Sequence, residues 1–159
     1  MRNLLSNGAM IVAGMVSLPG IVTTLDAQLP EMPGTALKFD FRLPIIRNFF
    51  AAAGAPAKDY AHVFLSEADR NALDWRLLPS ISFVETTGGK SARNNNLFGW
   101  DGGRAVFVSM TDSIRQVARS LGTAARYKDK DLDAMLWAYN PSLAYLRKVK
   151  SVMSRIAPD

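Results

Sequence analysis

Residues 81–90 read Ile-Ser-Phe-Val-Glu-Thr-Thr-Gly-Gly-Lys, an apolar run that closes on a carboxylate and then breaks into glycines. The positions three, four and seven residues before Glu85 are small or apolar. They are Ser82, Ile81 and Leu78. This spacing predicts a helix that carries Glu85 near its end, on the stripe that faces the core.

A carboxylate in this position is expected to have a raised pKa. Partial burial disfavours the charged form, and the C-terminal end of a helix is the negative end of its dipole. A carboxylic acid that stays neutral near about pH 6–7 can protonate a leaving oxygen, as glycosidases require. The alternative is that Glu85 simply turns its side chain out into solvent.

The composition predicts one globular domain preceded by a leader. The chain has 159 residues, of which 48% are hydrophobic, and a net charge of +5. That charge suits an anionic partner such as cell wall, nucleic acid or a membrane surface. The basic residues are dispersed, and the one cluster, at 147–150, reads as a solvated helix face, so we do not expect a nucleic-acid partner. The chain has no Cys and only one His, His62, so no metal or organic cofactor is predicted.

The first 27 residues resemble a secretory signal peptide, with Arg2 at the start and no charge from Leu4 to Leu25. An uncleaved N-terminal anchor is the alternative, and only then would the chain be a membrane protein. Either reading predicts an exported protein of the periplasm, cell envelope or medium. Residues 28–56 read as a linker in which 43–53 form either a short helix or a mobile segment, and 57–159 as the folded domain.

The domain is expected to be mostly α-helical, with five or six helices. Helices are predicted over about 59–72, 75–86 and 112–121, from Asp131 onward, and from Asn140 to the end, with Asp59, Asp74 and Asn140 as caps. Residues 104–110 alternate in hydrophobicity and predict a short irregular or β segment.

The polar loop between the second and third predicted helices contains three successive Asn and then an aromatic pair, Phe98 and Trp100. Amides hydrogen-bond sugar hydroxyls and acetamido groups, and aromatic rings stack on sugar faces, so the loop is a candidate sugar site. The alternative is a loop fixed by Asx turns, with its aromatic side chains in the core.

Four segments together resemble the lysozyme-like superfamily over about residues 60–157. They are Glu85 at a helix end, Asn95-Asn96-Leu97-Phe98-Gly99-Trp100, Phe107-Val108-Ser109 and Ala138-Tyr139-Asn140-Pro141. The Asn-Leu-Phe-Gly run and the closing Ala-Tyr at 144–145 are similar to bacterial endo-β-N-acetylglucosaminidases of the autolysin and flagellar type. The Ala-Tyr-Asn segment and Glu-Thr-Thr-Gly are also similar to lytic transglycosylases, whose usual motif is Glu-Ser.

The resemblance implies a role for each matching residue. Glu85 would be the catalytic acid, and Tyr139 would project toward the catalytic centre. The substrate groove would be lined by Thr86, Asn95, Asn96, Leu97, Phe98, Gly99, Trp100 and Asn140. Thr86 replaces the Ser of many relatives and keeps its hydroxyl, whereas Trp100 stands where relatives often carry Ile, Met or Gln.

Glycosidases usually need a second carboxylate roughly 5–9 Å from the first. Asp101 and Asp112 are the nearby candidates, and Asp101 also fits a turn before Gly102-Gly103. If Asp101 orients a water, the reaction is hydrolysis. If Glu85 acts alone as acid and then base, the substrate's acetamido group or 6-hydroxyl closes the intermediate, as the resemblance to transglycosylases implies.

These features predict a peptidoglycan hydrolase of the glucosaminidase type, with peptidoglycan glycan strands as its partner. A lytic transglycosylase that leaves 1,6-anhydro-MurNAc ends is one alternative. A non-catalytic wall-binding domain that has kept the groove is the other.

Overall fold

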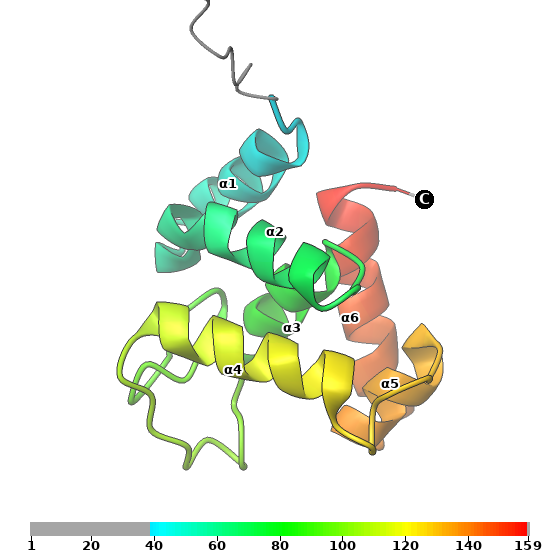
Figure 1. Cartoon of the computed structure of the whole chain (residues 1–159). Helices are drawn as coiled ribbons and strands as arrows, with labels where there is room; N and C mark the ends of the chain where they lie inside the picture. The colour runs from blue at the N-terminus through cyan, green and yellow to red at the C-terminus, as the bar shows by residue number, and fades with distance from the viewer. Residues whose placement is uncertain (1–38, 159) are drawn as a thin grey trace, which may run out of the picture. The chain divides into compact units, whose positions relative to one another are not determined.

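The computed structural model describes residues 39–158, and the predicted leader and most of the predicted linker lie outside these residues. The described part is helical, which confirms the expected mostly-α class (Figure 1). Its elements are α1 (Arg42–Ala52), the 3₁₀ helix η1 (Pro56–Tyr60), α2 (Ala61–Arg70), α3 (Leu77–Thr86), α4 (Met110–Thr123), α5 (Leu132–Tyr139) and α6 (Leu143–Ile156). Residues 104–109 are irregular, and no strand occurs within 39–158.

Helix α3 is the central element of the described unit. In Figure 1, α2 and α4 cross in front of α3 and α6 runs beside it. Every residue from Leu77 to Ser82 is buried, including two serines whose small side chains allow close packing. Pro79 is tolerated because it is the third residue of the helix, where its missing N–H would have had no partner within the helix.

Three later helices begin at side-chain caps. Ser109, Asp131 and Ser142 accept hydrogen bonds from the backbone N–H three residues ahead, at 3.1, 2.8 and 3.3 Å. The last helix therefore begins at Ser142, and Asn140 is not its cap as the sequence predicted. Asp59 lies inside η1 and also caps no helix, because the chain enters α2 directly from the 3₁₀ turn.

Helix α1 belongs to the folded unit, which begins at Lys38. The short helix considered for the linker exists, and its Ile46 and Phe50 are fully buried. The ring of Phe50 stacks at 5.6 Å from that of Phe64 and lies 6.5 Å from that of Phe83. The domain therefore starts earlier than residue 57, because the core would lack these side chains without α1.

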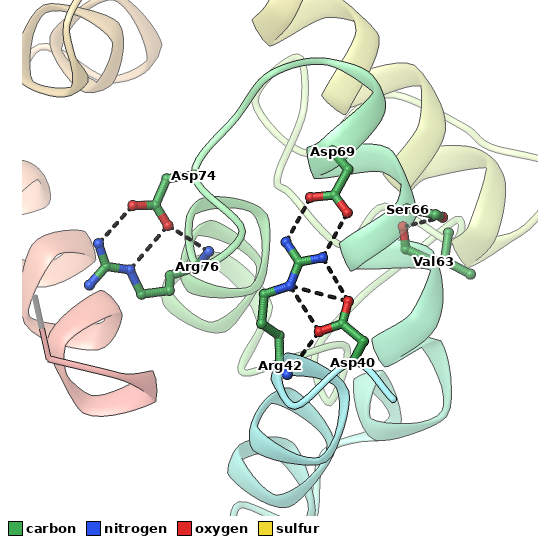
Figure 2. Close-up of polar contacts among 7 residues, drawn as sticks. All are labelled: Asp40, Arg42, Val63, Ser66, Asp69, Asp74 and Arg76. Carbon is green, nitrogen blue, oxygen red and sulfur yellow. Dashed lines mark hydrogen bonds and ion pairs between the residues drawn. The ribbon is translucent and has the colours of Figure 1, made fainter. Parts of the chain in front are cut away.

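An ion-pair cluster fixes the start of α1 against the end of α2. The Arg42 guanidinium donates to both carboxylate oxygens of Asp69, at 2.7 and 2.8 Å, and to Asp40 at 2.6 Å (Figure 2). These bonds hold the pKa of both carboxyls below the usual range. A second pair, Asp74 with Arg76, precedes α3, and Arg76 also donates to the Ala157 carbonyl near the C-terminus.

Truncation of Phe50 tests whether α1 is part of the core. Phe50→Ala is expected to lower the free energy of unfolding by about 3–5 kcal/mol, because it removes a buried ring that the neighbouring helices cannot replace. Phe39→Ala is the matched control, since that ring is 80% exposed and should change stability by less than about 0.5 kcal/mol. Urea unfolding measures both, and equal effects would show that α1 does not complete the core.

Candidate functional site

Glu85 lies in the last turn of α3, where the helix ends in a left-handed residue. That residue is Thr87, with φ of 53°, one position before the first of the two glycines. The Gly88 N–H bonds back to the Ser82 carbonyl at 3.1 Å and closes the helix end. Gly88 cannot carry a side chain, because a Cβ there would lie 2.7 Å from the Phe50 ring.

The carboxylate of Glu85 is half-buried, and no cation of the described residues forms an ion pair with it. Burial raises the pKa of Glu85 above its ordinary value, and the nearby Tyr145 hydroxyl opposes that effect. The Tyr145 hydroxyl is buried and makes no hydrogen bond of normal geometry, so its opposing effect is weak. Glu85 is thus a carboxyl group that favours its protonated form.

The backbone of Gly99 packs directly against this carboxylate. A Cβ at Gly99 would lie 2.6 Å from Glu85 Oε2, and the residue has φ of +58°. Only glycine accepts both conditions without strain or displacement. Gly99 therefore forms the wall of the site beside the acid.

Asn96 organises the loop that carries Gly99. Its Oδ1 accepts from the Trp100 N–H at 2.9 Å and the Phe98 N–H at 3.3 Å, and its Nδ2 donates to the Trp100 carbonyl at 3.0 Å. The side chain is 3% exposed, so its amide is already committed to the loop. Asn96 positions the wall of the site, and the predicted hydrogen bonds from its amide to a sugar would require these bonds to break.

Most of the other residues that the sequence predicts to contact substrate instead form hydrogen bonds or core contacts within the protein. Thr86 Oγ1 donates to the Leu97 carbonyl at 2.8 Å and accepts from Gly89, which joins the end of α3 to the loop. Asn95 Nδ2 donates to the Phe107 carbonyl at 2.9 Å. Leu97 and Phe98 are fully buried in the core. Neither side chain is exposed to a ligand, and the Phe98 ring lies 6.4 Å from that of Phe64 on α2.

An aromatic cluster lies beside Glu85 and Gly99. Tyr139 donates its hydroxyl to the Phe98 carbonyl at 2.6 Å and stacks on Tyr145, with 5.9 Å between parallel rings. Trp100 lies 5.7 Å from the Tyr139 ring and 6.4 Å from the Tyr127 ring. The predicted residues Tyr139 and Trp100 are therefore brought together near the acid.

The sequence predicted no site role for Tyr127, and Tyr145 entered the prediction only within the Ala-Tyr pair at 144–145. Tyr127 stands in a stretch that reads as a polar connector, yet it is 3% exposed. Tyr145 begins the buried stripe of α6, which continues through Val149 and Met153. A four-residue spacing backward from Val149 would have found Tyr145.

Three hollows follow one another along this surface, and we call them together the groove. The first, of about 180 Å³, is lined by Glu85, Gly99 and Arg93 among others. The second, of about 300 Å³, shares Glu85 and adds Asn140 and Tyr145. The third, of about 330 Å³, shares Gly99 with the first and is lined by Trp100, Asp101, Arg126, Tyr127 and Tyr139. Glu85 thus lies within the groove and not at its end.

Asp101 does not share a hollow with Glu85. It is exposed, has φ of 53° before two glycines of positive φ, and pairs with Arg104 at 2.8 Å. That pairing lowers the pKa of Asp101 and keeps it ionised. In the described part of the chain, no carboxylate other than Glu85 lines either of the two hollows that Glu85 lines.

Other features of the described residues limit what the site contains. His62 is exposed on α2, and residues 39–158 hold no group of three or more His, Cys, Asp or Glu side chains placed to bind one metal ion. None of the described helices is both long and apolar enough to cross a membrane.

Comparisons with family models, with curated proteins and with solved structures find no match for this chain. The resemblance to the lysozyme-like superfamily therefore stays a prediction that depends on the residues quoted for it.

The raised pKa of Glu85 makes stability depend on pH. The folded chain holds this proton more tightly than the unfolded chain, so the resulting stabilisation is complete below the unfolded value of about 4.5 and is lost as pH rises through the folded pKa. Glu85→Gln removes the titration. The variant should be more stable than the parent at pH 7 by roughly 0.5–1 kcal/mol, and the gain should vanish near pH 4.

Urea unfolding of both proteins at pH 4 and pH 7 measures this difference. Asp101→Asn is the control, because its exposed carboxyl has a lowered pKa and should give no gain at pH 7. A gain from Glu85→Gln that is equal at both pH values would contradict the expected titration.

Proposed function

We propose that this chain is an exported glycosidase that cleaves β-1,4 bonds of peptidoglycan glycan strands, of the endo-β-N-acetylglucosaminidase type. The observation that carries the proposal is the half-buried Glu85 within the groove, with a raised pKa and no cation from residues 39–158 in an ion pair with it. A carboxyl group whose charged form is disfavoured by burial holds its proton more tightly, and it can give that proton to a glycosidic oxygen.

Glu85 would act first as acid and then as base. Its proton goes to the glycosidic oxygen as the bond from that oxygen to the anomeric carbon breaks. The carbonyl oxygen of the substrate's own acetamido group then closes on the anomeric carbon. The Glu85 carboxylate next takes a proton from a water that attacks the same carbon, which opens the ring intermediate and restores the acid.

The aromatic cluster suits the sugar rings on one side of the acid. Trp100, Tyr127 and Tyr139 line the third hollow, and aromatic faces pack against the apolar faces of sugars. Arg126 lies 4.9 Å over the Tyr127 ring and adds polar contacts at the rim. On the other side, Asn140 and Ser142 offer an amide and a hydroxyl.

A lytic transglycosylase is the second candidate, and one observation favours it. Among the described residues Glu85 is the sole carboxylate of the two hollows that it lines, so no second acid beside it is placed to act as a base on water. In that reaction the substrate's 6-hydroxyl gives its proton to Glu85 and attacks the anomeric carbon, which leaves a 1,6-anhydro end.

Mass spectrometry of digested peptidoglycan tests the proposal. The full chain should release fragments, and Glu85→Gln should lower the rate by at least about 100-fold because it removes the proton donor. Reducing GlcNAc ends would indicate the glucosaminidase, and 1,6-anhydro-MurNAc ends the transglycosylase. Asp101→Asn is the control and should keep more than half of the activity.

No release by the folded parent or by either variant would reject the enzymatic proposal. Binding of the parent to insoluble peptidoglycan would then support the remaining class, a wall-binding domain that retains the groove.

Gly99→Ala tests whether activity depends on the position of the Glu85 carboxylate, independently of folding stability. The added Cβ would push the Glu85 carboxylate aside, and misplacement by about 1 Å can cost roughly 100-fold in rate. Gly54→Ala is the matched control, since Gly54 also has positive φ, +61°, but its Cβ would meet no atom within 4 Å. Both variants should lose about 1 kcal/mol of stability, whereas only Gly99→Ala should lose activity.

A further inference from the structure

A fourth hollow, of about 460 Å³, lies between the end of α3 and the second half of α6. Its floor is apolar and its rim is basic. We call it the basic hollow, and its main lining residues are Phe83, Val84, Arg147, Lys148, Ser151 and Arg155. It shares Val84 and Lys148 with the second hollow of the groove, so the two adjoin.

The cations of the basic hollow lack acidic partners. Within residues 39–158, no carboxylate forms an ion pair with Arg147, Lys148 or Arg155, and no acid lines the basic hollow. Lys150 on the same helix differs, because it pairs with Asp133 at 2.9 Å. Three uncompensated cations around one concave site favour an anionic ligand.

The site is also shaped for a ligand with an apolar portion. The Arg155 guanidinium lies 5.5 Å over the rings of Phe49 and Phe83, which hold its planar group at the edge of the floor. A guanidinium fixed in this way can bind a carboxylate through two parallel hydrogen bonds. Phe83 and Val84 would contact the aliphatic portion of the same ligand.

We infer that the basic hollow binds the carboxylate-bearing peptide attached to the glycan strand. This inference depends on the proposed function, because it places a strand in the groove beside Glu85. A strand seated there would present its peptide substituent to the adjoining hollow across Val84 and Lys148. The peptide supplies carboxylates for the cations and short aliphatic side chains for the floor.

Calorimetric titration with soluble glycan strands tests the inference, using the Glu85→Gln chain so that no digestion occurs. The two matched substrates are glycan strands that keep their uncrosslinked peptides and the same strands after an amidase has removed those peptides. The strands that keep their peptides should be bound about five- to tenfold more tightly, and Arg147→Gln/Lys148→Gln in the same chain should abolish the difference. Both side chains are exposed, so this variant should fold.

Lys150→Gln is the control, because Lys150 does not line the basic hollow, and it should keep the preference. Arg155→Gln is the second variant and should also lose the preference. Equal binding of the two substrates, or a preference that the double variant keeps, would overturn the inference.

Two further outcomes have distinct meanings. A preference that disappears when hydrofluoric acid removes wall phosphate polymers, and not when the peptides are removed, would overturn the peptide as ligand in favour of the phosphate polymer. Digestion by the Glu85-containing chain decides the proposed function separately. Activity without a peptide preference rejects this inference alone, whereas absence of both rejects both.

Discussion

Helix α3 is apolar over most of its circumference, and the fold depends on covering it. A helix of this kind cannot be stable at a surface. Helices α2 and α6 pack on it, the Phe49 ring of α1 lies 4.9 Å from that of Phe83, and Leu77, Leu78 and Ile81 are buried. The cover is incomplete at the last turn, where α3 meets the loop after it. Glu85 lies at that opening, and its position there follows from how far the neighbouring helices reach.

The loop after α3 is rigid because its polar side chains bond to its own backbone. Asn96 and Thr86 together join the end of α3 to residues 97–105. Buried amides and hydroxyls are usually paired, and here the partners are backbone carbonyl and N–H groups of the same loop and of the end of α3. The result is a fixed wall, with Gly99 against the Glu85 carboxylate. From the sequence alone, the polar residues that build this wall suggest direct contact with a sugar.

Tyr139 and Tyr145, beside Glu85, contribute both to core packing and to the electrostatic environment of the carboxylate. Burial raises the pKa of Tyr139 and Tyr145, so both stay neutral, and the Tyr139 hydroxyl donates to the Phe98 carbonyl. Burial likewise disfavours the charged form of Glu85. Tyr139 also lines the third hollow of the groove, together with Trp100 and Tyr127. One group of aromatic side chains therefore links the core, the acid and the groove.

The sequence alone determined the helical class, the helix that ends near Glu85 and the start signal at Asp131. These features are local, because helical periodicity and capping depend on residues within a few positions of each other. Tertiary structure decided the rest. It brought α1 into the core, committed Asn96 to its own loop and placed Tyr145 beside Glu85. It also left Lys148 and Arg155 without an ion pair to any acid within residues 39–158. Each of these outcomes depends on contacts between residues far apart in the chain, and a short-range pattern carries no information about such contacts.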